Sequence, residues 1–225
     1  MRGLLIKPHP LSSPGTIGDY AEELGVELVG HVASEDGPLP PVDDFDFVVA
    51  MGAPWSVYGR EVEPWIQYVV QLFRDAVKRQ IPVLGVCFGA QAFAQALGGE
   101  VRKAAETELG WSTVLTHDPD MIPEGPWFMW HSDTFTLPPG ARLEAWTDAG
   151  PQAYTLERHL MVQFHPEVRP DLLEGWSRAE TSDVFERLSL DRGAVEEETG
   201  RRAGEARERA RALFDRFLHG VAASG

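Results

Sequence analysis

The single cysteine of the chain, Cys87, lies between two glycines at the junction of an apolar run and an expected helix. The run from Val83 to Gln91 (VLGVCFGAQ) has the G-x-C-x-G spacing of a nucleophile elbow, in which small flanking residues let a strand turn sharply into a helix. The first N–H groups of that helix carry a partial positive charge, which favours a thiolate. These features predict a nucleophile at Cys87, with a small buried core residue as the alternative.

A second segment supplies a base for this thiol. The apolar run Met161–Phe164 is followed by His165-Pro166-Glu167. Residues two apart in an extended chain point the same way, so Glu167 is expected to lie beside His165. A nucleophile, a base and a group that orients the base form a triad in any chain order. We therefore expect Cys87 to attack, His165 to take and return the proton, and Glu167 to orient the imidazole.

His131 is the competing base. It lies in the stretch Trp130-His131-Ser132-Asp133, which has the composition of a loop, so the carboxylate two residues away is not expected to lie beside it on a strand. Asp133 is expected to cap a turn there. The sequence therefore favours His165 over His131.

Four stretches in this order resemble the class I glutamine amidotransferases of the Cys-His-Glu type. They are MGAPWSVY at 51–58, GVCFGAQ at 85–91, WHSD at 130–133 and QFHPE at 163–167, and together they cover about the first 180 residues. The chain is most similar to the glutaminase domain of GMP synthase and its stand-alone relatives. The resemblance implies hydrolysis of the side-chain amide of glutamine through a γ-glutamyl thioester on Cys87, giving glutamate and ammonia.

The same resemblance implies which residues surround the reacting carbonyl. The backbone N–H groups of Ala53 and Phe88 would form the oxyanion hole. Family members commonly have glycine at the position of Ala53, and alanine fits only if the backbone there needs no positive φ. The implied substrate contacts are Gly52, Gln91, Ser132 and Asp133. Gln91 is expected one helical turn beyond Cys87, with a polar residue on the helix surface as the alternative.

Composition narrows the classes of partner. The net charge of −15 opposes binding to nucleic acid, which relies on clustered lysine and arginine. No signal peptide, membrane-spanning stretch or disulfide pair is expected, so the prediction is a cytoplasmic protein with no membrane partner. The sequence has no phosphate loop, no dinucleotide fingerprint and no cysteine–histidine set with zinc spacing, and therefore predicts neither a metal nor a cofactor.

Strand and helix signals alternate in the first part of the chain. Strands are expected at Leu4–Ile6, Val26–Val32, Phe45–Met51 and Pro82–Val86, with helices at Ile17–Leu24 and Pro64–Arg79. This pattern predicts an α/β fold with an open, mostly parallel, twisted sheet flanked by helices, of the flavodoxin-like type. Gly52 and Cys87 then follow neighbouring strands at their carboxyl ends, where such sheets bind ligands.

Shorter strands are expected in the second part, and they predict a small antiparallel extension that brings His165 back to the elbow. Their ranges are Trp111–Thr116, Trp127–Trp130, Leu143–Thr147, Gln152–Leu156 and Leu160–Phe164, followed by helices at Pro170–Ala179 and Ala194–His219. We expect residues 1–225 to form a single domain.

Three functions fit these residues. The favoured one is a glutamine amidotransferase or glutaminase, whose ammonia would pass to a synthetase or another acceptor on a separate polypeptide. The second is a γ-glutamyl hydrolase or peptidase that uses the same triad on γ-glutamyl peptides or conjugates. Only the size of the pocket would distinguish it from the first, because a larger leaving group needs a wider pocket on its side of the thiol. The third is a non-catalytic binding protein on the same scaffold.

Overall fold

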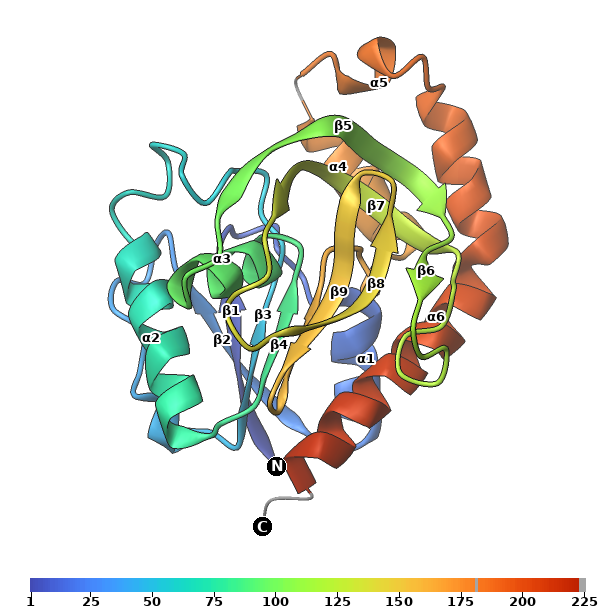
Figure 1. Cartoon of the computed structure of the whole chain (residues 1–225). Coiled ribbons are helices and arrows are strands. Elements are labelled where there is room, and N and C mark those ends of the chain that lie inside the picture. The colour runs from blue at the N-terminus through green and yellow to red at the C-terminus, as the bar shows by residue number, and fades with distance from the viewer. Residues whose placement is uncertain (181, 223–225) are drawn as a thin grey trace.

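A computed structural model describes residues 1–180 and 182–222 of the chain. Its centre is an eight-stranded sheet with the order β2-β1-β3-β4-β10-β9-β8-β6 (Figure 1). The parallel part consists of β2 (Glu27–Val32), β1 (Arg2–Lys7), β3 (Phe47–Ala50), β4 (Val83–Val86) and β10 (His159–Val162). The antiparallel part consists of β9 (Gly150–Leu156), β8 (Arg142–Thr147) and β6 (Leu115–Thr116).

Helices cover both faces of the parallel strands. One face packs against α2 (Ile66–Arg79) and α3 (Phe88–Ala96), and the other packs against α1 (Gly15–Glu23) and the long α6 (Arg192–Ala222) (Figure 1). A short 3-10 helix, Val42–Asp44, precedes β3. Because both faces are buried, the central strands are continuously apolar, as parallel sheets require.

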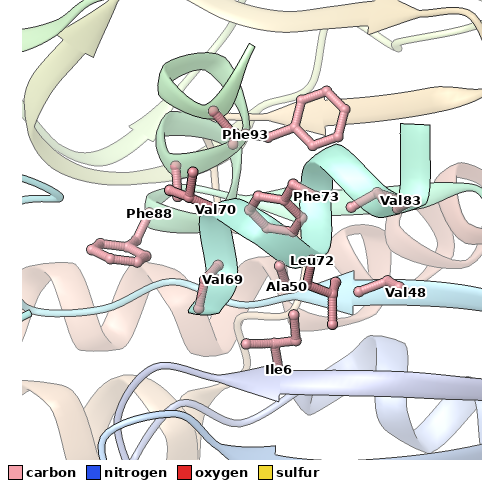
Figure 2. Close-up of a cluster of buried hydrophobic side chains, with 14 of the residues drawn as sticks. Ile6, Val48, Ala50, Val69, Val70, Leu72, Phe73, Val83, Phe88 and Phe93 are labelled. Carbon is pink, nitrogen blue, oxygen red and sulfur yellow. The ribbon is translucent and has the colours of Figure 1, made fainter. Parts of the chain in front are cut away.

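The side-chain period of the strands divides the core in two. Val48 and Ala50 of β3 join the cluster under α2 and α3, whereas Phe47 and Val49 point to the opposite face and contact the cluster under α1 and α6. Figure 2 shows Phe73 of α2 and Phe93 of α3 packed above the strands that carry Val48 and Val83. The α2–α3 layer thereby fixes the helix that begins directly after Cys87.

A second, two-stranded antiparallel sheet consists of β5 (Val101–Ser112) and β7 (Trp127–Phe135), with an irregularity between Lys103 and Glu108. The remaining helices, α4 (Pro170–Ala179) and α5 (Val184–Arg187), precede α6 and share a small apolar cluster with β7. This arrangement confirms the predicted α/β sheet with a small antiparallel extension. Within the described residues, no helix is long and apolar enough to cross a bilayer.

Two sequence predictions about local structure are wrong. The WHSD stretch at 130–133 is expected in a loop, but it lies within β7, which pairs with β5. Its buried polar side chains obscured the strand pattern because their partners lie on other elements. The helix expected from Pro64 begins at Ile66, after hydrogen-bonded turns that include Trp65 N–H to the Val62 carbonyl.

Candidate active site

Cys87 occupies the sharp turn between β4 and α3. Its φ of 49° and ψ of −107° are sparsely populated for a residue with a side chain, so the surrounding structure must hold them in place. Its N–H donates to the Val162 carbonyl of β10 at 2.8 Å, and its carbonyl accepts from Gln91 N–H at 3.0 Å. The strand on one side and the helix on the other therefore fix the backbone of the elbow.

The two glycines of the elbow are explained by close backbone approach. A Cβ atom at Gly89 would lie 2.3 Å from the carbonyl oxygen of Ala50, and one at Gly85 would lie 2.5 Å from Sδ of Met161. Neither distance is compatible with a real side chain. The G-x-C-x-G spacing is thus a requirement of packing α3 against β3 and β10 at this point.

His165 and Glu167 form a buried pair beside the elbow. Nδ1 of His165 lies 2.8 Å from Oε1 of Glu167, and both side chains are almost fully buried. The backbone of the segment is held at both ends, because His165 N–H donates to the Phe128 carbonyl at 2.8 Å and the Glu167 carbonyl accepts from Thr16 N–H at 3.0 Å. The imidazole orientation is therefore set by a carboxylate within a fixed turn.

Gly52 marks where the histidine and the cysteine meet. A Cβ atom at Gly52 would lie 3.0 Å from Cε1 of His165 and 3.5 Å from Cβ of Cys87, so both side chains flank this glycine. The topology explains the meeting point. Gly52, Cys87 and His165 follow β3, β4 and β10, which are adjacent parallel strands whose carboxyl ends share one edge of the sheet.

The charge state of His165 follows from its neighbours. Burial by itself would lower the pKa of His165, but the negative charges of Glu167 and of a Cys87 thiolate outweigh it and raise this pKa well above its ordinary value. Nε2 of His165 is buried and has no close hydrogen-bond partner among the described residues, while the Cys87 side chain approaches the ring closely enough to help raise its pKa through a hydrogen bond as well as by its charge. The imidazole is therefore held at Nδ1 and free at Nε2.

The two expected oxyanion donors belong to different segments, the first turn of α3 and the loop after β3. Phe88 is the first residue of α3, where N–H groups have no intrahelical acceptor, and its ring packs in the core against Trp65. Ala53 follows Gly52 at the edge of the same cavity. Ala53 is not among the described residues with positive φ. An alanine therefore fits at this position, where family members commonly have glycine.

Gln91 is buried, and its alternative as a polar residue on the helix surface is wrong. Its Nε2 donates to Oε1 of Gln163 at 3.0 Å, and Nε2 of Gln163 donates to Sγ of Cys87 at 3.4 Å. The sequence pattern assigned no role to Gln163. The sequence does contain a signal for it, because Gln163 is the one amide in an otherwise apolar run before His165.

Ser132 and Asp133 of β7 line the cavity, and both side chains accept hydrogen bonds from other segments. The Asp133 carboxylate accepts hydrogen bonds from the Tyr58 hydroxyl, at 2.8 Å, and from the Ser56 hydroxyl. The Ser132 hydroxyl accepts from Thr107 at 3.1 Å. Asp133 therefore does not cap a turn, as was expected, but ties β7 to the loop that carries Gly52 and Ala53.

His131 has a carboxylate partner that the sequence pattern did not reveal. Its Nε2 lies 3.1 Å from Oε2 of Glu108 on β5, and its Nδ1 lies 3.1 Å from the Asp133 carbonyl. Burial would raise the pKa of Glu108, but hydrogen bonding to His131 and its charge, with help from Thr147 and Gln152, lower it overall. Both ring nitrogens of His131 are engaged, whereas His165 has a free Nε2.

Cys87, His165, Glu167, His131 and the predicted substrate contacts line one cavity of about 570 Å³. Its inner wall includes Cys87 and His165, and its outer wall is formed by α4, the residues after it and α5, which contribute side chains such as Trp176 and Arg187. Lys103 of β5 lies on the rim, opposite Asp133 in the strand register. Among the described residues, no three His, Cys, Asp or Glu side chains are grouped as metal ligands.

The protein thus has a doubly wound α/β sheet with a Cys-His-Glu site. Its cysteine elbow and its histidine–carboxylate pair lie at the carboxyl edge of the sheet. The family model of class I glutamine amidotransferases matches residues 17–174. The chain therefore belongs to the class I glutamine amidotransferase family, as the four sequence stretches indicated.

Relatives of known name agree with this family. A GMP synthase (glutamine-hydrolyzing) subunit from Sulfolobus acidocaldarius is 37% identical over 157 residues, which are 65% of this chain and 79% of that protein. A GMP synthase (glutamine-hydrolyzing) from Thermosynechococcus vestitus is 39% identical over 130 residues, which are 54% of this chain. The match covers only 23% of that longer enzyme, so the chain corresponds to about a quarter of its length.

Solved structures extend the similarity over almost the whole chain. A glutamine amidotransferase from Thermotoga maritima has a TM-score of 0.87 at 25% identity, covering 97% of this chain and 98% of that one. A glutamine amidotransferase from Methylobacillus flagellatus has a TM-score of 0.88 at 26% identity, covering 97% and 94%. The similarity therefore includes α5 and α6, which lie beyond the part matched by the family model.

Proposed function

We propose that the protein hydrolyses the side-chain amide of glutamine to glutamate and ammonia, with Cys87 as the nucleophile. The observation that carries this proposal is the position of His165, which is held by Glu167 at Nδ1, free at Nε2, and packed with Cys87 around Gly52. A base that is oriented on one side and unoccupied on the other is suited to proton transfer next to a nucleophile.

The reaction proceeds in two halves. The Cys87 thiolate attacks the γ-carbonyl carbon, and the N–H groups of Phe88 and Ala53 stabilise the oxyanion that forms. Protonated His165 gives its proton to the amide nitrogen, the C–N bond breaks, and ammonia leaves behind a γ-glutamyl thioester. Water then adds to the thioester while His165 takes its proton, and the C–S bond breaks to release glutamate and regenerate the thiolate.

The amino-acid end of the substrate is placed toward Gln91, Ser132 and Asp133, which line the cavity beyond the thiol. The Asp133 carboxylate is an acceptor for the α-ammonium group, since each of its oxygens has one hydroxyl donor and further acceptor capacity. The ammonia passes to a synthetase or another acceptor protein. The Sulfolobus relative is named as one subunit of a GMP synthase, which supports an arrangement of this kind.

The test replaces the nucleophile. Cys87→Ser should reduce glutamate release from glutamine by about 10³-fold or more in kcat, because an unactivated hydroxyl is a far weaker nucleophile. Wild-type protein should also be labelled at Cys87 by the glutamine-like electrophile 6-diazo-5-oxonorleucine, as read by mass spectrometry. Folded wild-type protein that is neither labelled nor active would rule out the proposal.

The cavity supports a second candidate, a γ-glutamyl hydrolase. A volume of about 570 Å³ is in the range of pockets that hold ligands larger than a single amino acid. The outer wall next to His165 includes Trp176, whose ring packs edge-on against the imidazole at 5.1 Å between centroids. A leaving group larger than ammonia would lie against this wall.

The two candidates share the thioester, so only the leaving group separates them. Wild-type and Cys87→Ser protein should be compared on glutamine, γ-glutamyl dipeptides and glutathione. A kcat/KM that is higher for glutamine favours the amidotransferase, and one that is higher for the γ-glutamyl peptides favours the hydrolase. Turnover that persists in Cys87→Ser protein would exclude the shared mechanism.

A further inference from the structure

Gln163 connects the nucleophile to α3 through its side-chain amide. It follows the last residue of β10 and is 1% exposed, and its backbone N–H donates to the Gln152 carbonyl at 2.8 Å. The amide nitrogen donates to Sγ of Cys87 at 3.4 Å, and the amide oxygen accepts from Nε2 of Gln91 at 3.0 Å. A fully buried amide is thus placed against the sulfur.

Gln91 determines which end of that amide faces the sulfur. A glutamine amide has a donor end and an acceptor end, and the hydrogen-bond network fixes its orientation. With the donor of Gln91 on Oε1 of Gln163, Nε2 of Gln163 is directed at Sγ. A thiolate accepts hydrogen bonds and donates none, so this orientation suits the charged form of Cys87.

We propose that Gln163 is a catalytic residue that stabilises the Cys87 thiolate, and that Gln91 is a positioning residue that orients it. The inference rests on the proposed function, because it needs Cys87 to act as the nucleophile. When the C–S bond forms, the sulfur gives up its electron pair and the hydrogen bond weakens. When water displaces the thioester, the C–S bond breaks and the pair returns to sulfur, where the Nε2–H of Gln163 stabilises it.

Other ionisable groups around the sulfur must be considered in any pH experiment. His165 lies beside Cys87, with Glu167 behind it, and the N-terminus of α3 lies on the other side. The remaining ionisable side chains of the cavity belong to other elements, namely His9, Lys103, His131, Asp133, Glu180 and Arg187. Gln163 carries no charge, so replacing it by another neutral residue leaves all of these charges in place.

The test is the pH dependence of Cys87 alkylation by iodoacetamide, which reports the thiolate and needs no glutamine. Gln163→Met keeps a buried, unbranched side chain and removes the donor. It should raise the apparent pKa of Cys87 by about one unit or more and, at pH values below the wild-type pKa, slow alkylation about tenfold or more, since hydrogen bonds to charged groups are the strong ones. Gln152→Met is the matched control, because Gln152 is also fully buried and bonds to Glu108 instead of Cys87.

Gln91→Met should raise the same pKa by a smaller amount, because Gln163 remains but is no longer held. The double variant should be no more affected than Gln163→Met, since Gln91 acts through Gln163. If Gln163→Met does not fold, Gln163→Leu is the second neutral replacement that removes the donor, and it should raise the pKa in the same way. Each variant is checked first by its thermal unfolding curve.

Three results would overturn the inference. They are an unchanged or lowered pKa of Cys87 in the Gln163 variants, an equal rise in Gln152→Met, or additive effects of Gln91→Met and Gln163→Met. These experiments separate the inference from the proposed function. If the alkylation of Cys87 depends on Gln163 but the wild-type protein releases no glutamate, the proposed function is wrong and the role of Gln163 stands. If the wild-type protein hydrolyses glutamine but the pKa of Cys87 does not depend on Gln163, only the role of Gln163 is wrong.

Discussion

Two histidines that line the same cavity each pair with a carboxylate, and the geometry of the pairs separates their roles. His165 pairs with Glu167 at 2.8 Å and His131 pairs with Glu108 at 3.1 Å. In the second pair the imidazole also contacts the Asp133 carbonyl, which leaves no ring nitrogen for proton transfer. In the first pair Nε2 is free on the side of the nucleophile. The His131 pair instead steadies β7, which carries Ser132 and Asp133.

Glu167→Gln should separate the two pairs experimentally. Removing the carboxylate charge lowers the pKa of His165, because burial then acts with less opposition, and less of the enzyme holds the thiolate with an imidazolium. We expect kcat/KM for glutamine to fall by about 10²–10⁴-fold, the range for loss of an orienting carboxylate or of acid–base catalysis. Steady-state kinetics and NMR titration of the His165 ring would measure both effects.

Glu108→Gln is the matched control for that substitution, since it neutralises a buried carboxylate paired with a cavity histidine. Its effect should be smaller and should appear mainly in KM, because β7 positions the substrate end of the cavity. A larger loss of kcat in Glu108→Gln than in Glu167→Gln would make His131 the base.

The elbow depends on how closely α3 approaches the sheet. Gly89 lets the first turn of α3 rest on β3, where a Cβ atom would lie 2.3 Å from a backbone oxygen that cannot move aside without shifting the strand. The contact holds α3 against the sheet directly after Cys87, whose conformation is unusual. The stability of the protein and the geometry of the nucleophile therefore both depend on the distance between Gly89 of α3 and the Ala50 carbonyl of β3.

Gly89→Ala should lower both the stability of the protein and its catalytic rate. The added methyl forces α3 away from β3, and overpacking of this kind destabilises by about 1–3 kcal/mol. A displaced elbow should also lower kcat for glutamine on the order of 10²-fold, as misplacement of reacting groups by about 1 Å does. Urea denaturation and kinetics on the same preparation would measure the two losses.

Gly204→Ala provides the comparison, because a Cβ atom there would meet nothing within 4 Å in an exposed part of α6. It should stabilise the protein by about 0.5–1 kcal/mol through helix propensity and leave kcat unchanged. A Gly89→Ala variant as stable and as active as wild type would contradict the packing explanation.

The sequence could predict the parts of the site whose signals are local. The elbow is encoded by two glycines around Cys87, and the His165–Glu167 pair by two residues separated by a proline, so both can be predicted from the sequence. The Glu108–His131 and Gln163–Cys87 contacts join residues 23 and 76 positions apart, which no periodicity connects. For the same reason the strand character of 131–135 was missed, because polar side chains buried by distant partners do not alternate like an ordinary strand.

Two buried histidines with shifted pKa values make the stability of the protein depend on pH. His165 has a raised pKa in the folded state, so its contribution is complete below the ordinary pKa of histidine and is lost as pH rises through the raised value. His159 of β10 behaves in the opposite way. It is 1% exposed, packs against the Phe93 ring at 5.0 Å between centroids, and neither ring nitrogen has a hydrogen-bond partner among the described residues.

Burial, with a smaller contribution from the charge of Arg158, lowers the pKa of His159 to about 4. The unfolded chain binds a proton at this residue near pH 6.5, whereas the folded protein resists protonation until about pH 4, so the free energy of unfolding should fall as pH decreases between these values. By pH 4.5 the loss from His159 should reach about 2 to 3 kcal/mol. His159→Phe keeps an aromatic ring against Phe93 and removes the titration, so urea denaturation at pH 7 and pH 4.5 should show a smaller difference than in wild type by that amount. An equal pH dependence in the two proteins would mean that His159 is not held neutral by the core, and that the acid sensitivity of the fold resides in its carboxylates.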